Sequence, residues 1–202
     1  MQVTELLLII AVITAVVFLV VLFVEGAHRP DYNPSYHTGS ELTLGERGWV
    51  QIANFLQMGI GMFAFAFGVN WALEDATGAI LLAAFAIGLI VAGIFRPDPL
   101  RNYPPHAAAE VTWRGQLHNA SGPLMFLALA AACLVLAGSL EGPWRIYTVI
   151  TAVVGVVLTA WTAVSFQRDA VNTGLVQRTL ILVYWAWVIL TGIHLTTSPP
   201  AL

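Results

Sequence analysis

The sequence predicts an all-α polytopic membrane protein, a bundle of six transmembrane helices. Of its 202 residues, 58% are hydrophobic and only 9% are charged, with a mean hydropathy of +0.81. Soluble domains usually carry about 25% charged residues, so this chain has too few polar groups to cover a water-facing surface. Six apolar runs have the length of about 20 residues that a helix needs to cross hydrocarbon. Each run is expected to be helical because lipid leaves unpaired backbone groups without partners.

The six predicted spans form one transmembrane domain that covers residues 1–202. They lie near residues 4–24, 49–71, 76–95, 120–139, 144–165 and 177–196. The first run has no basic segment before it, its apolar core is too long for a signal peptide, and no convincing cleavage site follows it. We therefore interpret it as a retained helix rather than a signal peptide.

The arginines predict the orientation of the bundle. The chain has no lysine, and most of its eight arginines fall in or beside the connections after the first, third and fifth spans. These are Arg29, Arg47, Arg96, Arg101, Arg114, Arg168 and Arg178, whereas the opposite side has only Arg145. Since basic residues are retained on the cytoplasmic side, both termini are expected outside, in a multi-pass protein of the cell inner (plasma) membrane.

The connection from Glu25 to Gly48 is long and polar, and it has two interpretations. Ser40 and Glu41 have the pattern of a helix start that leads into the second span, with Ser40 as the cap and Glu41 in the first turn. In the simpler interpretation, the connection is a solvated loop that carries this cap. In the other, it folds over the cytoplasmic mouth of the bundle, since long ordered loops often carry function.

The segment 93–122 concentrates polar side chains in a chain that is otherwise almost free of charge. A helix is expected from His106 to His118, and polar residues recur along it at a spacing of four. These residues are His106, Glu110, Arg114 and His118. The pattern favours either an ion-paired polar face or a metal site. In a metal site, His106 and Glu110 would share one ion, and His118 or Asp98 would complete its ligands.

Other polar residues fall at the ends of the spans or inside them. Asp98 follows the third span, where it either ends that helix in an Asp-Pro turn or joins an ion-pair network across helices. The arginines expected at the same depth are Arg47, Arg168 and Arg178. Inside the second span, polar side chains are expected to form interhelical hydrogen bonds, and glycines are expected to allow close packing. The two sets are Gln51, Asn54 and Gln57, and Gly59, Gly61 and Gly68.

Several short motifs give the chain a family resemblance. They are RPDY at 29–32, SEL at 40–42, G--GW-Q--NF at 45–55, GIF--DP at 93–99, His106, His118, and GLVQR at 174–178. In this order, between six spans, they resemble the bacterial and archaeal six-helix membrane family catalogued as domain of unknown function 998. The corresponding motif positions are Asp31, Ser40, Glu41, Trp49, Asn54, Asp98, His106, His118, Gln177 and Arg178. The resemblance implies a six-helix membrane fold and leaves the activity unassigned.

Three functions remain open for such a chain. The first is a non-enzymatic membrane protein that binds a lipid or small amphiphile near its cytoplasmic face, with arginines on a phosphate headgroup. The second is a membrane-embedded lipid hydrolase or transferase. In it, Asp98 and His118 would do acid–base or metal-ligand work, and Ser40 or water would attack. The third is a structural subunit of a larger membrane complex.

The predicted site residues follow from these alternatives. The ligand-binding candidates are Arg47, Asn54, Asp98, His106, His118, Gln177 and Arg178. The catalytic candidates are Asp98, His118 and Ser40, and the metal candidates are His106, Glu110 and His118. Membrane lipids are the expected partners and nucleic acid is not. A membrane-protein partner or a second copy of the chain stays open, and no cofactor is assigned.

Overall fold

The structure is a computed structural model that describes residues 1–197, and every regular element within them is helical. The long helices are α1 (Val3–His28), α2 (Gly48–Leu73), α3 (Ala76–Ile94), α4 (Trp113–Leu136), α5 (Gly142–Gln167) and α6 (Thr173–Thr197). A short 3-10 helix, η1 (Gly39–Thr43), lies between α1 and α2. All six long helices are long and apolar enough to cross a membrane. The predicted all-α, six-helix bundle of a multi-pass membrane protein is therefore confirmed.

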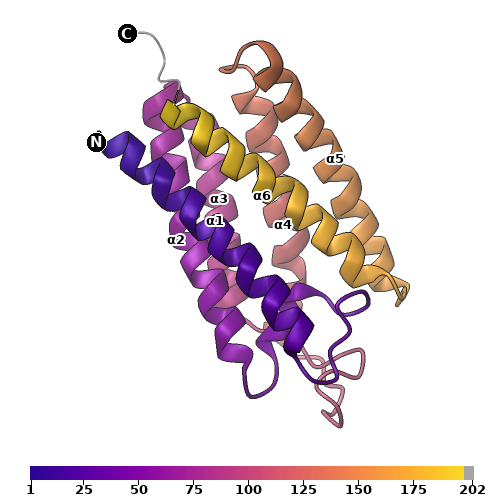
Figure 1. Ribbon diagram of the computed structural model, residues 1–202. Helices are drawn as coiled ribbons and strands as arrows, with labels where there is room; N and C mark the ends of the chain where they lie inside the picture. The colour runs from indigo at the N-terminus through magenta and orange to yellow at the C-terminus, as the bar shows by residue number, and fades with distance from the viewer. Residues whose placement is uncertain (198–202) are drawn as a thin grey trace.

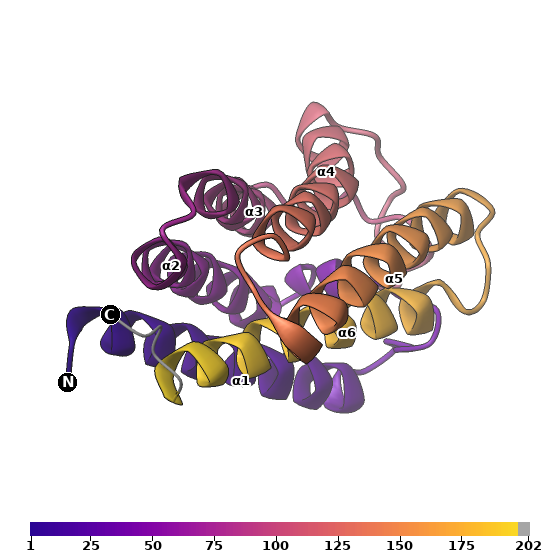
Figure 2. The same ribbon diagram turned by 90° about the horizontal axis from the view of Figure 1, so that it is seen from above.

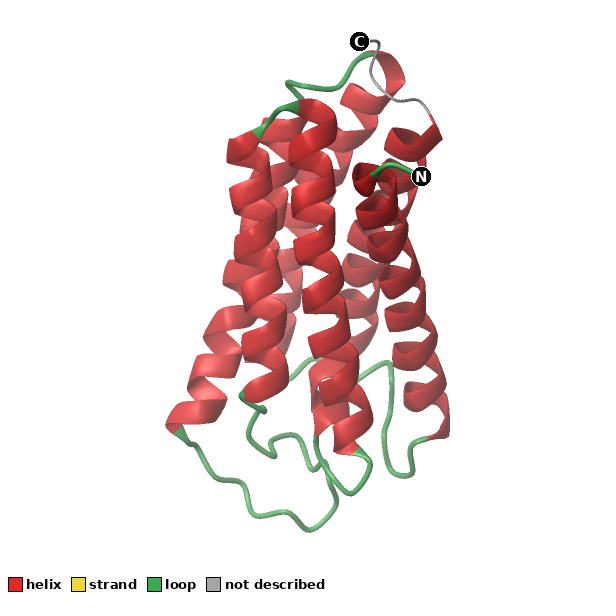
Figure 3. Ribbon diagram, turned by 90° about the vertical axis from the view of Figure 1, so that its left-hand side faces the viewer, coloured by secondary structure: helices red, strands yellow, loops and turns green. Residues whose placement is uncertain are grey.

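The helices form a closed ring. Each helix packs against its neighbours in the sequence, and α6 returns to pack against α1 (Figure 1). Seen from above, α2, α3 and α4 form one row, and α1, α6 and α5 form the other (Figure 2). Short connections join antiparallel neighbours at one end, where α1 starts and α6 ends. The other three connections, residues 29–47, 95–112 and 168–172, gather at the opposite end, which we call the loop-rich end (Figure 3).

Two predicted helix starts at the loop-rich end are wrong. No helix runs from His106 to His118, because His106 adopts a left-handed φ of 64° that a right-handed helix cannot continue. Instead α4 starts at Trp113, where the Thr112 hydroxyl accepts a hydrogen bond from the backbone N–H of Gly115 at 3.1 Å. His106, Glu110, Arg114 and His118 consequently do not share one helical side.

The second wrong start concerns Ser40. It does not cap the second span, because α2 begins only at Gly48, after a turn in which Gly45 has a φ of 74°. The cap belongs to η1, where the Glu41 carboxylate accepts a hydrogen bond from the backbone N–H of Thr38 at 2.6 Å. Thr38 and Glu41 have the spacing of a capping box, and this pairing places Ser40 inside the turn.

Glycines allow α2 to lie close to both of its neighbours. A Cβ atom at Gly61 would meet the Thr14 hydroxyl of α1 at 1.9 Å, and one at Gly59 would meet Ile90 of α3 at 2.7 Å. Gly68 lies in the same way against Leu8. Since lipid tails are as apolar as the helix surfaces, helices in a membrane associate through such close packing, as predicted for these three positions.

A ladder of side-chain amides links α2 to α1. The Gln57 amide donates to the Thr14 carbonyl at 3.2 Å, and that of Asn54 donates to the Phe18 carbonyl at 3.1 Å. Within the ladder, Gln57 also donates to Asn54, and Asn54 donates to the Gln51 oxygen. The predicted interhelical hydrogen bonds are confirmed. The ladder ends at the NH₂ group of Gln51, which has no partner among the described residues.

Arg178 ties the start of α6 to the connection between α1 and α2. Its buried guanidinium donates to the carbonyls of Pro34 at 2.6 Å and His37 at 2.9 Å, and it also contacts the Tyr32 hydroxyl. The same connection contributes buried residues that pack against Tyr103 of the 95–112 connection. The connection therefore folds over the end of the bundle, as the second of its two interpretations expected.

Two further arginines complete these contacts. Arg29 donates to the carbonyls of Leu44 at 3.0 Å and Arg47 at 3.1 Å, and it forms an ion pair with Glu25 at 2.7 Å. Arg101 pairs with Asp169 at 3.1 Å and donates to the Ala170 carbonyl. Together with Arg178, these arginines join all three connections of the loop-rich end.

His37 lies at the centre of these contacts in a defined protonation state. Its Nδ1 accepts a hydrogen bond from the Asn33 backbone N–H at 2.9 Å, so Nε2 carries the proton that is donated to the Arg101 carbonyl at 3.2 Å. Burial lowers the pKa of His37, and the positive charges of Arg101 and Arg178 lower it further, against the effect of the carbonyl contact. A proton on Nδ1 would face the Asn33 donor.

We expect the contact between the connections to weaken as the pH falls through 6.5, the ordinary pKa of histidine. A lowered pKa means that the closed state binds fewer protons than the open one, so its stability is present above this pH and is lost below it. Hydrogen exchange of residues 33–41, corrected for intrinsic rates, should show up to about tenfold more opening at pH 5.5 than at pH 7.5. The variant His37→Gln keeps a donor and an acceptor but cannot titrate. If its opening depended on pH as strongly as that of the wild type, the assignment to His37 would be contradicted.

Candidate functional site

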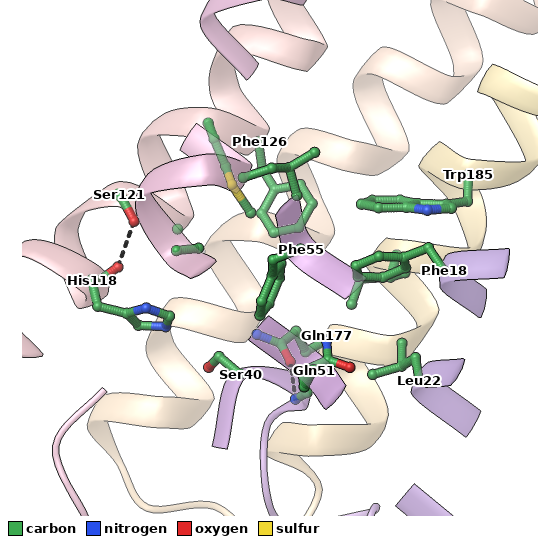
Figure 4. Close-up of a pocket in the computed structure, with 16 residues that line it drawn as sticks. Phe18, Leu22, Ser40, Gln51, Phe55, His118, Ser121, Phe126, Gln177 and Trp185 are labelled. Atoms are coloured by element: carbon green, nitrogen blue, oxygen red, sulfur yellow. Dashed lines mark hydrogen bonds between the residues drawn. The ribbon is translucent and has the colours of Figure 1, made fainter. Parts of the chain in front are cut away.

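A cavity with two chambers lies inside the loop-rich end. The outer chamber, of about 320 Å³, lies between η1, α4, α5 and α6. The inner chamber, of about 50 Å³, is lined by residues of η1 and of all the long helices except α5. The residues that line both chambers are Ser40, His118, Gly122, Phe126 and Gln177, and we call them the junction residues. Figure 4 shows their polar side chains turned toward a common space.

The walls of both chambers are mainly apolar. Phe18, Phe55 and Trp185 surround the inner chamber, where Phe18 and Trp185 have ring centroids 4.7 Å apart (Figure 4). Thr159 and Thr162 of α5 line the outer chamber, but their hydroxyls donate to carbonyls of their own helix at 2.7 and 2.8 Å. Their donors are therefore occupied. The lining also includes the exposed residues Asn119, Pro123 and Gln167, so the outer chamber reaches the molecular surface.

His118 is buried in the first turns of α4, and its ring points into the cavity. Its Nδ1 lies 2.7 Å from the Phe95 carbonyl oxygen. Since a carbonyl can only accept, Nδ1 carries a proton, and in the neutral ring Nε2 presents a lone pair. No side chain or backbone group of the described residues is hydrogen-bonded to this Nε2 atom. His118 therefore contributes an acceptor at the junction.

Ser40 presents its hydroxyl to both chambers from η1. The Thr38 hydroxyl donates to the Glu41 carboxylate at 2.9 Å, so its single proton is already used. The contact of 3.1 Å between the Ser40 and Thr38 hydroxyls must then have Ser40 as its donor. A chain of hydroxyls thus runs from Ser40 through Thr38 to the buried Glu41. Burial raises the pKa of the Glu41 carboxyl, although its hydrogen bonds from Thr38 act in the opposite direction.

Two glutamine amides supply donors to the site, and the buried indole Nε1 of Trp185, in the wall of the inner chamber, is a further donor without a partner among the described residues. The Gln177 oxygen accepts a hydrogen bond from the Gly39 backbone N–H at 2.7 Å, which fixes the amide and leaves its NH₂ group on the cavity side. Gln51 is fully buried in the wall of the inner chamber, and its NH₂ group has no partner within residues 1–197. The cavity therefore contains two amide donors beside the acceptors of His118 and Ser40.

The structure brings only some of the predicted site residues together. Ser40, His118 and Gln177 meet at the junction, and Asn54 lies one step away, hydrogen-bonded to Gln51. Arg178 is held by the loop carbonyls instead of facing the cavity. Arg47 pairs with Glu25, with its side chain largely exposed.

Asp98 has a local role at the start of α4. One of its carboxylate oxygens accepts from the Thr112 backbone N–H at 3.0 Å, and the other accepts from the Thr112 hydroxyl at 2.6 Å. It forms no ion pair with Arg47, Arg168 or Arg178 within residues 1–197, so the expected ion-pair network is wrong. The alternative, a helix stop followed by a turn, fits its position after α3. Asp98 supports the segment that carries His118 and does not line either chamber.

The metal candidates do not gather. His106 and Glu110 are exposed, whereas His118 is buried beside Phe95. Across residues 1–197, no three His, Cys, Asp or Glu side chains are arranged to hold one metal ion.

The sequence did not indicate some residues of this site. Gly122 and Phe126 follow His118 at spacings of four in α4. The helical periodicity of the sequence could therefore have indicated that the three residues share one side of the helix. Thr159 and Thr162 of α5 gave no such signal, because threonines that bond to their own helix are frequent inside membrane spans.

Comparison with known proteins agrees with the motif resemblance. A family model described as "Protein of unknown function (DUF998)" matches residues 12–194. No curated protein and no solved structure matches the chain. The matched range includes all or part of each of the six long helices and every junction residue. The chain therefore belongs to the DUF998 family of membrane proteins of unknown function.

Proposed function

We propose that this protein binds a lipid or another small amphiphile in the two-chambered cavity of the loop-rich end. The observation that carries the proposal is the combination of a polar junction with an outer chamber whose wall is mainly apolar. The outer chamber, of about 320 Å³, is within the range of about 300–1,000 Å³ that is usual for small-molecule sites. An amphiphile would place its chain in the outer chamber and its polar group at the junction.

The surroundings of the cavity support this arrangement. The wall threonines bond to their own helix, so an apolar chain beside them leaves no donor unpaired. Beside the junction, by contrast, the buried amide nitrogen of Gln51 has no partner among the described residues, and of the His118 ring only Nδ1 is hydrogen-bonded within them. Buried polar groups are normally hydrogen-bonded, so these atoms favour a ligand or water at this place. The alternative of a subunit in a larger membrane complex stays a prediction.

A side chain that fills the junction should prevent binding without damaging the fold. A Cβ atom at Gly122 would have no neighbour within 4 Å, and phenylalanine is a better helix former than glycine. We expect Gly122→Phe to lower the occupancy of amphiphiles that co-purify with the protein by about tenfold, a loss of about 1.4 kcal/mol. Native mass spectrometry from a mild detergent measures this occupancy.

The matched control is Ala120→Phe, which adds the same side chain to an exposed position of α4 outside the cavity lining. Its occupancy should equal that of the wild type. An unchanged occupancy in folded Gly122→Phe would reject the cavity as the binding place.

The hydroxyl chain from Ser40 to Glu41 favours a second candidate function, acyl transfer or hydrolysis with Ser40 as the nucleophile. Attack of the Ser40 oxygen on an ester carbonyl would pass its proton to Thr38, whose own proton would move to Glu41. The ester alcohol would then leave with a proton returned along the same chain, and water would release the acyl group. Carboxylates with a raised pKa are suited to such work near neutral pH.

A fluorophosphonate probe tests this candidate. The Ser40 oxygen would bond to phosphorus as fluoride leaves, and the adduct would be located by intact mass and peptide mapping. Labelling should disappear in Ser40→Ala and fall about tenfold or more in Glu41→Gln, because the proton acceptor is weakened. Ser35→Ala, at an exposed serine of the same connection, should label like the wild type. Absence of labelling at Ser40 in the folded wild type would remove this candidate.

We propose, from the arginines of the sequence, that the protein lies in the plasma membrane and that its loop-rich end faces the cytoplasm. The supporting observation is that Arg145 alone lies at the opposite end, where it donates to the carbonyls of Ala137 and Leu140. In a Cys133→Ala background, Ser139→Cys should react with an impermeant maleimide added to intact cells, and Glu46→Cys should not. The reverse pattern would invert the orientation.

A further inference from the structure

We infer that the cavity selects an uncharged headgroup that both donates and accepts hydrogen bonds, such as the hydroxyls of a monoacylglycerol or fatty alcohol, or a fatty amide. This inference rests on the proposed binding function and specifies its ligand class. It replaces the phosphate headgroup that the arginines at this end suggested from the sequence. Three observations carry it: the charge of the lining, the engagement of the arginines, and the pattern of donors and acceptors.

The lining of the cavity carries no formal charge. In the part of the chain that the structure describes, no aspartate, glutamate, lysine or arginine lines either chamber, and His118 is the one titratable side chain of the lining. An ionised group placed in an apolar enclosure without a partner loses its hydration and gains no counter-charge. A carboxylate or phosphate would therefore bind poorly here, whereas an uncharged polar group avoids this loss.

Each of the three nearby arginines has two of its three guanidinium nitrogens engaged by the protein, and the third is buried without a partner among the described residues. Arg178 binds the carbonyls of the 29–47 connection, Arg29 binds Glu25 and two carbonyls, and Arg101 binds Asp169. To reach a headgroup in the cavity, any of them would have to leave buried acceptors unpaired. Arg114 and Arg168 are exposed at the same end, but neither contributes to the lining.

The hydrogen-bonding groups at the junction and in the adjoining wall of the inner chamber are mixed. The amides of Gln51 and Gln177 offer N–H donors, while Nε2 of His118 and the Ser40 oxygen offer lone pairs. A carboxylate or a fully ionised phosphate has only acceptors, so it would satisfy the amides and oppose the two lone pairs. A hydroxyl or a primary amide satisfies both kinds of group.

The size of the inner chamber agrees with a small headgroup. One water needs about 10–15 Å³ of such volume, so about 50 Å³ holds only a few water-sized groups. A hydroxyl or an amide fits this limit. The chain of the ligand would then extend from the junction into the outer chamber, which reaches the surface between Asn119, Pro123 and Gln167.

Three probes with the same dodecyl-length chain test the inference: 1-monododecanoylglycerol, dodecanoate and dodecyl phosphate. Binding to the full-length protein in nanodiscs is measured at pH 8, where His118 is least able to supply a positive charge. We expect monododecanoylglycerol to bind at least about tenfold more tightly than either anion, the factor that corresponds to about 1.4 kcal/mol. This comparison uses the wild-type protein and needs no variant to fold.

A variant pair tests the position of the headgroup. Gln51→Met keeps the length of the side chain but removes its unpartnered amide donor, and affinity for monododecanoylglycerol should fall about fivefold, the usual loss for one hydrogen bond. Gln116→Met makes the same change at an exposed position of α4 outside the lining, and it should bind like the wild type. The thermal unfolding transition of each variant reports whether it is folded.

The outcomes separate this inference from the proposed function. If either anion binds as tightly as monododecanoylglycerol and Gly122→Phe blocks it, amphiphile binding stands and headgroup selection is overturned. Tight neutral binding that folded Gln51→Met leaves unchanged would overturn the assignment of this donor. If no probe binds and Gly122→Phe changes nothing, the proposed function itself fails.

Discussion

The buried guanidinium of Arg178 is the contact on which the loop-rich end depends. A charged group can be buried only when hydrogen bonds replace its hydration, and here carbonyls from Pro34, His37 and Gly174 surround it. Two of these carbonyls belong to the connection between α1 and α2, which is thereby fixed onto the start of α6. Gln177, the residue before Arg178, binds the backbone of Gly39 in the same connection. One helical turn of α6 thus positions both Ser40 and the amide that faces it.

Charge and polarity have separate places in this protein. The ion pairs and the arginine–carbonyl contacts hold the connections together outside the helices, whereas the cavity beneath them is lined by neutral groups only. This separation has a physical reason, because a charge at the outer face of the connections keeps its contact with water, whereas a charge in the mainly apolar chamber would lose much of its hydration. The amide ladder on α2 crosses between the two regions. Its last member, Gln51, brings a donor to the chamber without bringing a charge.

The same separation limits the chemistry of the site. Both carboxylate oxygens of Asp98 are hydrogen-bonded to Thr112 at the start of α4. Glu41 is therefore the carboxyl group left for chemistry at the junction, which it reaches through the hydroxyls of Thr38 and Ser40. His118 is oriented by the Phe95 carbonyl, so its free nitrogen is an acceptor or a base. These groups suit recognition of a neutral polar group, and they would suit acyl chemistry if Ser40 proves reactive.

The sequence by itself determined the membrane class, the number of spans and the interhelical role of the α2 amides, because length, hydropathy and periodicity act locally along the chain. It also indicated Ser40, His118 and Gln177, which proved to share one cavity. The assignments that failed were those that extended a local pattern across a connection. The helix expected from His106 was prevented by left-handed backbone at that residue, and the cap expected at Ser40 belongs to the Thr38–Glu41 pair. Only the tertiary structure decided which arginines are engaged by the connections and which polar atoms remain free, because those facts depend on contacts between residues far apart in the sequence.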